Sequence, residues 1–155
     1  MAASTNHTDS ARDPAGETKD PHPERVVSLR PHHIGCLQFW EIDYSERGRR
    51  FLQTEERLRK TLSSGGEAPI AVREGPDELC RECPRLVEGR CTHPRGDETD
   101  VRKWDKLVLR ELGVPYGSCL TAAEWRRRIA ERWPFRLCQR CQWREECRAG
   151  REIRS

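Results

Sequence analysis

The sequence has few apolar residues. Of its 155 residues only 34% are hydrophobic, whereas 35% are charged, and there is a single methionine. A domain with so little apolar material has a small core, and such domains often depend on disulfides or bound metal for stability. No stretch approaches the ~18 consecutive apolar residues of a membrane helix, and the first 25 residues lack the apolar segment of a secretory signal. We therefore expect a cytoplasmic protein without membrane contact.

Acidic residues are sparse at the C-terminal end. Residues 125–155 contain ten arginines against four glutamates, although the net charge of the whole chain is only +3. A basic end can contact nucleic acid or an acidic partner protein. Because the excess is modest, we expect a solvated surface here rather than a nucleic-acid interface.

Cysteine, in contrast, is abundant, with eight in the chain. Six of them form two triplets, each a Cys-x2-Cys pair followed by a third cysteine: Cys80, Cys83 and Cys91, then Cys138, Cys141 and Cys147. A Cys-x2-Cys pair directs two thiolates to one metal across a tight turn. In a reducing compartment such pairs more often bind metal or do redox work than form structural disulfides. The sequence therefore predicts thiolate-bound metal, whereas a disulfide framework would need an export route.

The triplets can be grouped in two ways. In a zinc-ribbon arrangement the two Cys-x2-Cys pairs share one site, which leaves Cys91 and Cys147 unexplained. If each triplet takes a fourth ligand of its own, all six thiolates are used. The second grouping explains more cysteines and favours two sites, or one site plus a second cysteine cluster.

A third motif, RPHHIGCL, supplies candidate fourth ligands: His32, His33 and Cys36. Cys36 is the natural fourth thiolate, and histidine can complete either a zinc site or a cluster. For one of the two histidines we expect packing at the helix start instead. His93 is a further candidate, although such a residue is more often part of an exposed loop. The isolated Cys119 is expected to be a small buried hydrophobe, and the alternative is an eighth thiolate that would complete two four-cysteine sites.

Neighbours of the cysteines have roles of their own. Asp77 is expected to cap the loop before Cys80 by accepting backbone N–H bonds. The Pro that follows Cys83 is a feature of ferredoxin cluster ligands. Trp143 would either shield a cluster from water or pack in the small core.

Beyond these motifs, the sequence predicts a small, mainly helical α+β domain with short strands, stabilised by metal and with long cysteine-bearing loops. Residues 1–25 are polar and proline-containing and can bury little apolar surface, so we expect a disordered tail. The cysteine-rich metal-binding domain would then span 26–150. Short apolar runs predict strands at 26–29 and 69–73.

Two helices are predicted between these strands. Pro31 suits the first turn of a helix that reaches about Trp40. Ser45 is expected to cap a second helix that ends at Gly65. That helix has one apolar face, formed by Phe51, Leu58 and Leu62.

Two further helices are predicted in the second half of the chain. Residues 92–100 are expected to form a loop, after which apolar residues recur at helical spacing up to a stop at Gly113. Thr121 followed by Glu124 is a capping-box signature for a helix that ends at Pro134.

The motifs, in this order, resemble the DUF1284 family of small bacterial and archaeal proteins. The resemblance runs from about Leu29 to Cys147, and it departs from the family at residues 38–44, where a Gly-rich stretch is expected. That family is of unknown function and is thought to bind iron–sulfur. The resemblance therefore implies an iron–sulfur cluster, whereas the spacing alone indicates only thiolate-bound metal. The matching positions are His32, His33, Cys36, Asp77, Cys80, Cys83, Pro84, Cys91, Asp105, Cys138, Cys141, Trp143 and Cys147.

Three functions are compatible with these features. The favoured one is a non-enzymatic iron–sulfur protein, with a 4Fe–4S cluster, that transfers electrons to a protein redox partner or holds a cluster for it. The second is a structural zinc site in an interaction or nucleic-acid-binding module. The third is an enzyme with an open iron site, in which His32 or His33 acts as acid or base.

Overall fold

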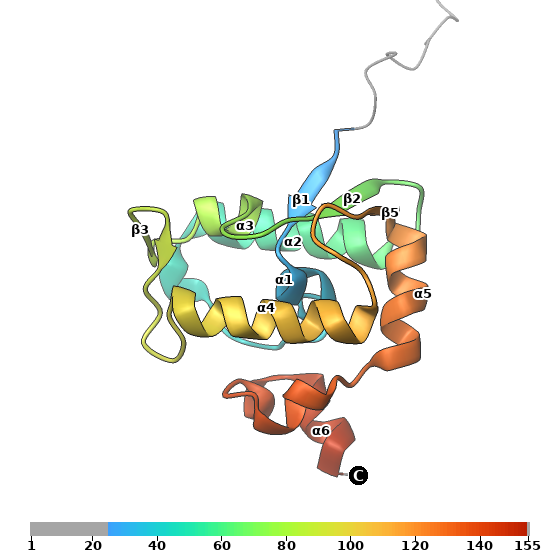
Figure 1. Ribbon diagram of the computed structural model, residues 1–155. Helices are drawn as coiled ribbons and strands as arrows, with labels where there is room; N and C mark the ends of the chain where they lie inside the picture. Colours follow the sequence, from blue (N-terminus) through green and yellow to red (C-terminus); the bar gives the residue numbers. More distant parts are fainter. Residues whose placement is uncertain (1–24, 155) are drawn as a thin grey trace, which may run out of the picture.

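A central sheet of three short strands organises residues 25–154, the part of the chain described by the computed structural model (Figure 1). Its strands lie in the order β1 (Val27–Leu29), β2 (Pro69–Val72) and β5 (Cys119–Thr121). β1 runs parallel to β2, and β5 runs antiparallel to it. Both predicted strands are confirmed, and β5 is a strand that the apolar pattern missed. The expected disordered tail lies outside the described residues, apart from Arg25.

Helices make up most of the regular structure, which confirms the predicted mainly helical fold with short strands. They are α1 (Pro31–Cys36), α2 (Arg49–Ser63), α3 (Glu78–Arg81), α4 (Glu98–Leu112), α5 (Ala122–Arg132) and α6 (Arg148–Arg154). Single turns of 3-10 helix form η1 (Ser45–Arg47), η2 (Arg136–Arg140) and η3 (Arg144–Glu146). A small hairpin consists of β3 (Leu86–Val87) and β4 (Arg90–Cys91). Over residues 25–154, no helix is both long and apolar enough to cross a membrane.

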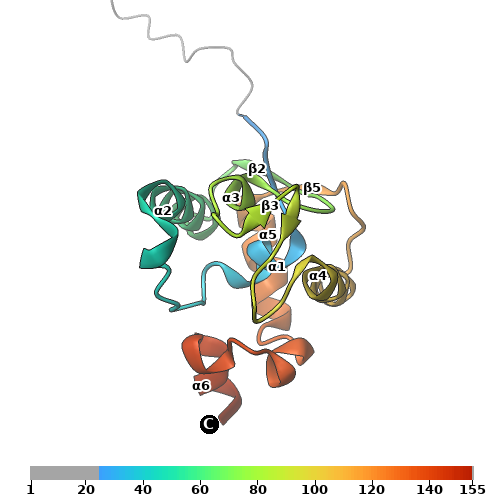
Figure 2. The ribbon, with the colours of Figure 1, turned by 90° about the vertical axis from the view of Figure 1, so that its left-hand side faces the viewer.

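The core lies between the sheet and two pairs of packed helices, α1 with α4 and α2 with α5. Figure 2 shows α1 and α5 in the space between α2 and α4. Trp125 of α5 is fully buried, and its indole N–H donates to the carbonyl oxygen of Ile70 in β2 at 2.8 Å. The apolar face predicted for α2 is confirmed, because Phe51, Leu58 and Leu62 are all buried.

Caps fix where the two long C-terminal helices begin. α4 starts at Glu98 because Asp97 and Asp100 form a capping box, in which the Asp97 carboxylate accepts the N–H groups of Thr99 and Asp100 at 3.0 and 3.2 Å. The prediction that all of residues 92–100 form a loop was wrong. It overlooked a capping box in which Asp100, rather than a glutamate, occupies the third helical position. The capping box predicted at Thr121 is confirmed at the start of α5.

Two boundaries near the N-terminus differ from the prediction. α1 ends at Cys36 and does not reach Trp40, which instead forms a β-bridge with Cys147. Ser45 does not cap α2, because it begins the separate turn η1. α2 starts only after Gly48, whose φ of 90° breaks the helical path at a value that favours glycine. The shorter α1 follows from the bridge between Trp40 and Cys147, which holds Trp40 in an extended pairing instead of a helix.

The C-terminal segment, residues 133–154, forms a layer on the far side of α4 from the sheet (Figures 1 and 2). Backbone hydrogen bonds attach it to the turn after α1. Glu41 N donates to Glu146 O at 2.8 Å, and Arg148 N donates to Phe39 O at 3.0 Å. The end of α1 and the second cysteine triplet are therefore neighbours in space, although they lie at opposite ends of the described chain.

Candidate metal centre

One cavity of about 380 Å³ gathers most of the sulfur in the chain. All eight cysteines lie within the described residues as free thiols, and seven of them line this cavity. The seven are Cys36, Cys80, Cys83, Cys91, Cys138, Cys141 and Cys147. The cavity wall also contains three histidines, His32, His33 and His93. Cys119 lies elsewhere and is exposed on the edge strand β5, so the expectation of a buried thiol was wrong.

Cys36 lies with the second triplet. Burial, and then the nearby thiols of Cys138, Cys141 and Cys147, raise the pKa of the Cys36 thiol well above its ordinary value. Burial, joined by the thiols of Cys141 and Cys147, raises the pKa of Cys138 to about 12. All four thiols line the same cavity, and their influence on one another shows that they are near neighbours in it. They stay protonated unless a bound metal cation stabilises the thiolates.

Close packing at Gly35 permits this approach. Gly35 precedes Cys36 in α1, and a Cβ atom there would lie 2.8 Å from Cε2 of Phe135 and 3.2 Å from Cγ1 of Val108. Phe135 is buried and lies three residues before Cys138. A residue without a side chain therefore lets α1 lie against both α4 and the segment that carries the second triplet.

A backbone contact recurs at three of the sulfurs. In each case the residue two positions after a cysteine places its backbone against the thiol: Cys91 with His93, Cys141 with Trp143, and Cys147 with Ala149. The N–H of Trp143 donates to Sγ of Cys141 at 3.4 Å. Such bonds stabilise a thiolate and tune the potential of a cluster bound to it.

The first triplet is held by α3 and the β3–β4 hairpin. Asp77 caps α3, and its Oδ1 accepts the N–H of Cys80 at 3.0 Å, which confirms its predicted capping role. Cys83 N donates to Cys80 O at 3.0 Å, so the Cys-x2-Cys segment forms the tight turn that directs both thiols to one side. Cys91 at the end of β4 donates its backbone N–H to Glu98 at 3.2 Å.

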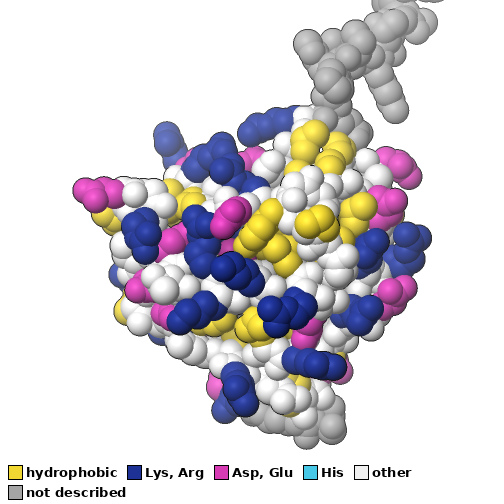
Figure 3. All heavy atoms as spheres, in the orientation of Figure 1, with side chains coloured by type: hydrophobic (Ala, Val, Ile, Leu, Met, Phe, Trp, Pro, Cys, Tyr) yellow, Lys and Arg dark blue, Asp and Glu magenta, His cyan; other side chains and the backbone are white. Residues whose placement is uncertain are grey.

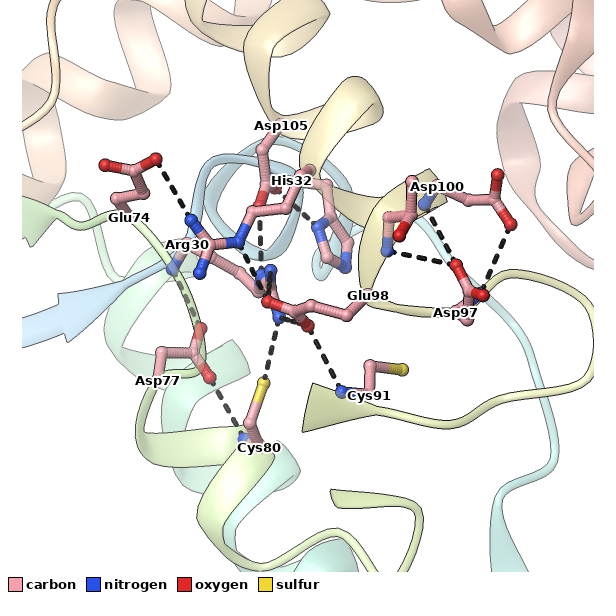
Figure 4. A network of polar contacts seen from close by, with 12 residues as sticks. Arg30, His32, Glu74, Asp77, Cys80, Cys91, Asp97, Glu98, Asp100 and Asp105 are labelled. Atoms are coloured by element: carbon pink, nitrogen blue, oxygen red, sulfur yellow. Dashed lines mark hydrogen bonds and ion pairs between the residues drawn. The ribbon is translucent and has the colours of Figure 1, made fainter. Parts of the chain in front are cut away.

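A buried arginine connects this triplet to the histidine motif (Figure 4). Arg30 is 1% exposed and pairs through Nε with Asp105 at 3.0 Å and through Nη2 with Glu98 at 3.1 Å. Its Nη1 lies 3.7 Å from Sγ of Cys80, and its backbone N–H donates to Asp77 at 2.8 Å. The sequence reasoning missed this role, although Arg30 is the first residue of RPHHIGCL and directly precedes the helix-starting proline.

Each histidine of the motif is paired with a buried carboxylate. His33 Nδ1 lies 2.6 Å from Asp77, and His32 Nδ1 lies 2.7 Å from Asp105. The ring centroids of the two histidines are 4.2 Å apart. Burial and then the neighbouring His33 lower the pKa of His32, which favours its neutral form. One ligand atom each of His33, Asp77 and Cys80 lies within 4.8 Å of the others, a spacing that could hold a metal ion.

Aromatic rings close part of the cavity. Trp143 is half-buried, lies edge-on to Tyr44 with centroids 6.3 Å apart, and is tilted against His93 at 4.9 Å. The guanidinium of Arg95 lies 3.9 Å from the centroid of the Trp143 ring. The expected packing of Trp143 is confirmed by its contact with Tyr44, and the ring also lines the sulfur-rich cavity, whereas shielding of a cluster stays a prediction.

Comparison with known proteins assigns a family. No curated protein and no solved structure matches the chain. Residues 44–147, about two thirds of the chain, match the family described as Protein of unknown function (DUF1284). The matched residues contain both cysteine triplets, whereas RPHHIGCL precedes them and is joined to the triplets by the tertiary structure. With both triplets inside the match, the chain belongs to the DUF1284 family.

Proposed function

We propose that the protein binds iron–sulfur clusters of the 4Fe–4S type and acts as an electron carrier or as a holder of clusters for a partner protein. The observation that carries this proposal is that Cys36, Cys138, Cys141 and Cys147 line one cavity as near neighbours. Four cysteine thiolates are the usual ligand set of such a cluster. The number and type of these donors therefore match those of the proposed cofactor.

The size of the cavity favours a cluster over a single ion. Four thiolates also suit zinc, so the ligand count alone does not decide. The cavity of about 380 Å³ is more than ten times the ~30 Å³ that one water molecule occupies in the liquid. A cluster of several iron and sulfide atoms uses such a space, whereas a lone tetrahedral ion does not.

The surface beside the cavity suggests the kind of redox partner. Lys103, Arg140 and Arg144 line the cavity and are exposed to solvent. Lys106 and the 41% exposed Leu107 lie beside Lys103 on α4, and Figure 3 shows Lys and Arg side chains along this face. A basic rim around an apolar side chain suits an acidic partner protein. Free thiols of this kind persist in a reducing compartment, so we propose that the protein acts in the cytoplasm.

Metal analysis tests the proposed cofactor. The full chain is purified without oxygen and assayed for iron, acid-labile sulfide and zinc, together with its visible spectrum. We expect a brown protein that contains iron and sulfide in similar amounts. Stoichiometric zinc without iron or sulfide, even after reconstitution with both, would overturn the proposal in favour of a structural zinc-binding module.

Salt dependence tests the proposed partner class. Electron transfer from an acidic redox protein should slow as ionic strength rises, because salt screens the attraction to the basic rim. The variant Lys103→Glu should slow the transfer at low salt and leave the cluster content unchanged. A rate independent of salt would remove the acidic partner from the proposal while leaving the cluster intact.

A further inference from the structure

We propose that the first triplet and His33 form a second metal centre, in which Nε2 of His33 is the fourth ligand and Asp77 holds the ring in place. The first centre would then have three sulfur ligands and one nitrogen ligand, unlike the four-sulfur centre at the second triplet. This inference rests on the proposal that the cavity holds metal, and it assigns the ligand set of its second half.

The first triplet lacks a fourth cysteine. A tetrahedral zinc site or a cubane cluster takes four protein ligands, and this triplet supplies Cys80, Cys83 and Cys91. Cys36, the natural fourth thiolate by sequence, lies with the other triplet. Cys119 is exposed on β5 and does not line the cavity. The fourth donor must therefore come from another residue type or from outside the chain.

Asp77 is close to Cys80, but it does not line the cavity and both of its oxygens are already hydrogen-bonded. Its Oδ1 accepts the N–H of Cys80 at 3.0 Å. Its Oδ2 accepts the backbone N–H of Arg30 at 2.8 Å and contacts Nδ1 of His33 at 2.6 Å. Asp77 is fully buried behind the residues that line the cavity and is not one of them. A carboxylate that binds the far nitrogen of a metal-ligating histidine is a common supporting partner and fixes the ring orientation.

The hydrogen bonds of each histidine fix its tautomer, and the tautomer decides whether a ring nitrogen is free to bind metal. Nδ1 of His93 accepts the N–H of Arg95 at 3.1 Å, so a neutral His93 carries its proton on Nε2 and has no lone pair there. Nδ1 of His33 meets a carboxylate oxygen and must donate. The neutral His33 ring therefore has its free lone pair on Nε2, the atom that a metal needs.

His32 has the same tautomer but a different place. Its Nδ1 meets Asp105 on α4, and its backbone N–H donates to the same carboxylate at 3.1 Å. Within the described residues, His33 and Asp77 each have a ligand atom within 4.8 Å of Sγ of Cys80, and His32 is not part of that group. His32 is thus a matched control for His33: a neighbour in sequence, paired with a buried aspartate, and lining the same cavity.

Mixed ligation would make the two centres unequal. Replacing a thiolate by a neutral histidine removes negative charge from a cluster and raises its reduction potential. The guanidinium of Arg30, 3.7 Å from Sγ of Cys80, acts in the same direction. An electron that enters the cavity would therefore settle on the first centre, and the four-sulfur centre would serve as its donor.

Nitrogen-sensitive pulsed EPR on the reduced, anaerobically reconstituted full chain tests the assignment. Wild type should bind two clusters, one of which shows coupling to a histidine nitrogen. The coupling should vanish in His33→Ala and persist in His32→Ala. The variant His33→Cys should keep both clusters, lose the coupling and lower the potential of the first centre, which guards against simple misfolding of His33→Ala. Coupling that survives in His33→Ala, or a wild type with a single cluster, would overturn the proposal.

A cobalt titration separates this inference from the iron–sulfur proposal. Co²⁺ is added to the reduced, metal-free chain, and thiolate charge-transfer bands report the ligand set of each site. Two sites, one of which changes its spectrum in His33→Ala but not in His32→Ala, support His33 as a ligand even if iron and sulfide fail to bind. Assembly of two clusters without any nitrogen coupling would refute the His33 ligand and leave the iron–sulfur proposal standing.

Discussion

Removing the charge of Arg30 should destabilise the protein strongly. Arg30 is 1% exposed, and the side chains of its partners Asp105 and Glu98 are 0% and 3% exposed. In the variant Arg30→Met the aliphatic stem is largely kept, but Asp105 and Glu98 lose their buried arginine. As ion-pair partners among the described residues, Glu98 keeps only Arg102, and Asp105 keeps only His32. Breaking a buried ion pair by removing one partner costs about 3–5 kcal/mol. Single domains are stable by only about 5–15 kcal/mol, so this loss is a large part of the total.

A matched variant isolates the effect of burial. Lys60 pairs with Glu56 at 3.1 Å, but both side chains are more than two thirds exposed. Lys60→Met should change the free energy of unfolding by less than about 0.5 kcal/mol. Arg30→Lys should fall between these extremes, because a single ammonium cannot contact both carboxylates in the way the planar guanidinium does.

Urea and thermal unfolding, followed by circular dichroism under anaerobic conditions, measure these differences. For a domain of this size, the loss in Arg30→Met should lower the melting temperature by about 10–20 °C. The metal content of each variant is measured in parallel, so that lost metal is not mistaken for the lost ion pair. An Arg30→Met protein within about 1 kcal/mol of wild type would refute the argument that this network is a major source of stability.

Four other substitutions test the site and the fold. Cys36→Ser should lose metal and melt at a lower temperature, whereas Cys119→Ser should keep both, because only the first thiol belongs to the cavity; metal analysis and melting curves showing the reverse would exchange their assignments. Gly35→Ala should lower the free energy of unfolding by about 1–3 kcal/mol, since its Cβ would press on the ring of Phe135; unchanged urea unfolding would show that the ring can move. Thr121→Ala should cost about 1 kcal/mol through loss of the α5 cap, again read from urea unfolding, and a loss below the error would mean that the cap contributes little.

Local signals in the sequence were sufficient for much of the helical structure. The capping box at Thr121 and the apolar face of α2 predicted helices at these places, because they depend on residues only three or four positions apart. Boundaries that depend on distant partners were not predictable. α1 ends at Cys36 because residues shortly after it form backbone hydrogen bonds with the C-terminal segment. No residue close to Cys36 in the sequence predicts that pairing.

The cysteine spacing, by itself, determined that this protein has two thiol-rich loops suited to metal. A Cys-x2-Cys turn is a local geometry, and any fold that accepts it directs two sulfurs to one side. Only the tertiary structure decided which candidate ligands lie near each triplet: Cys36 lies near the second triplet, and His33 lies near Cys80 and Asp77. This arrangement depends on close contact between α1, α4 and the C-terminal segment, which brings together residues far apart in the chain. These contacts between distant segments depend on core packing and on the buried charge of Arg30. Local sequence patterns therefore do not predict them.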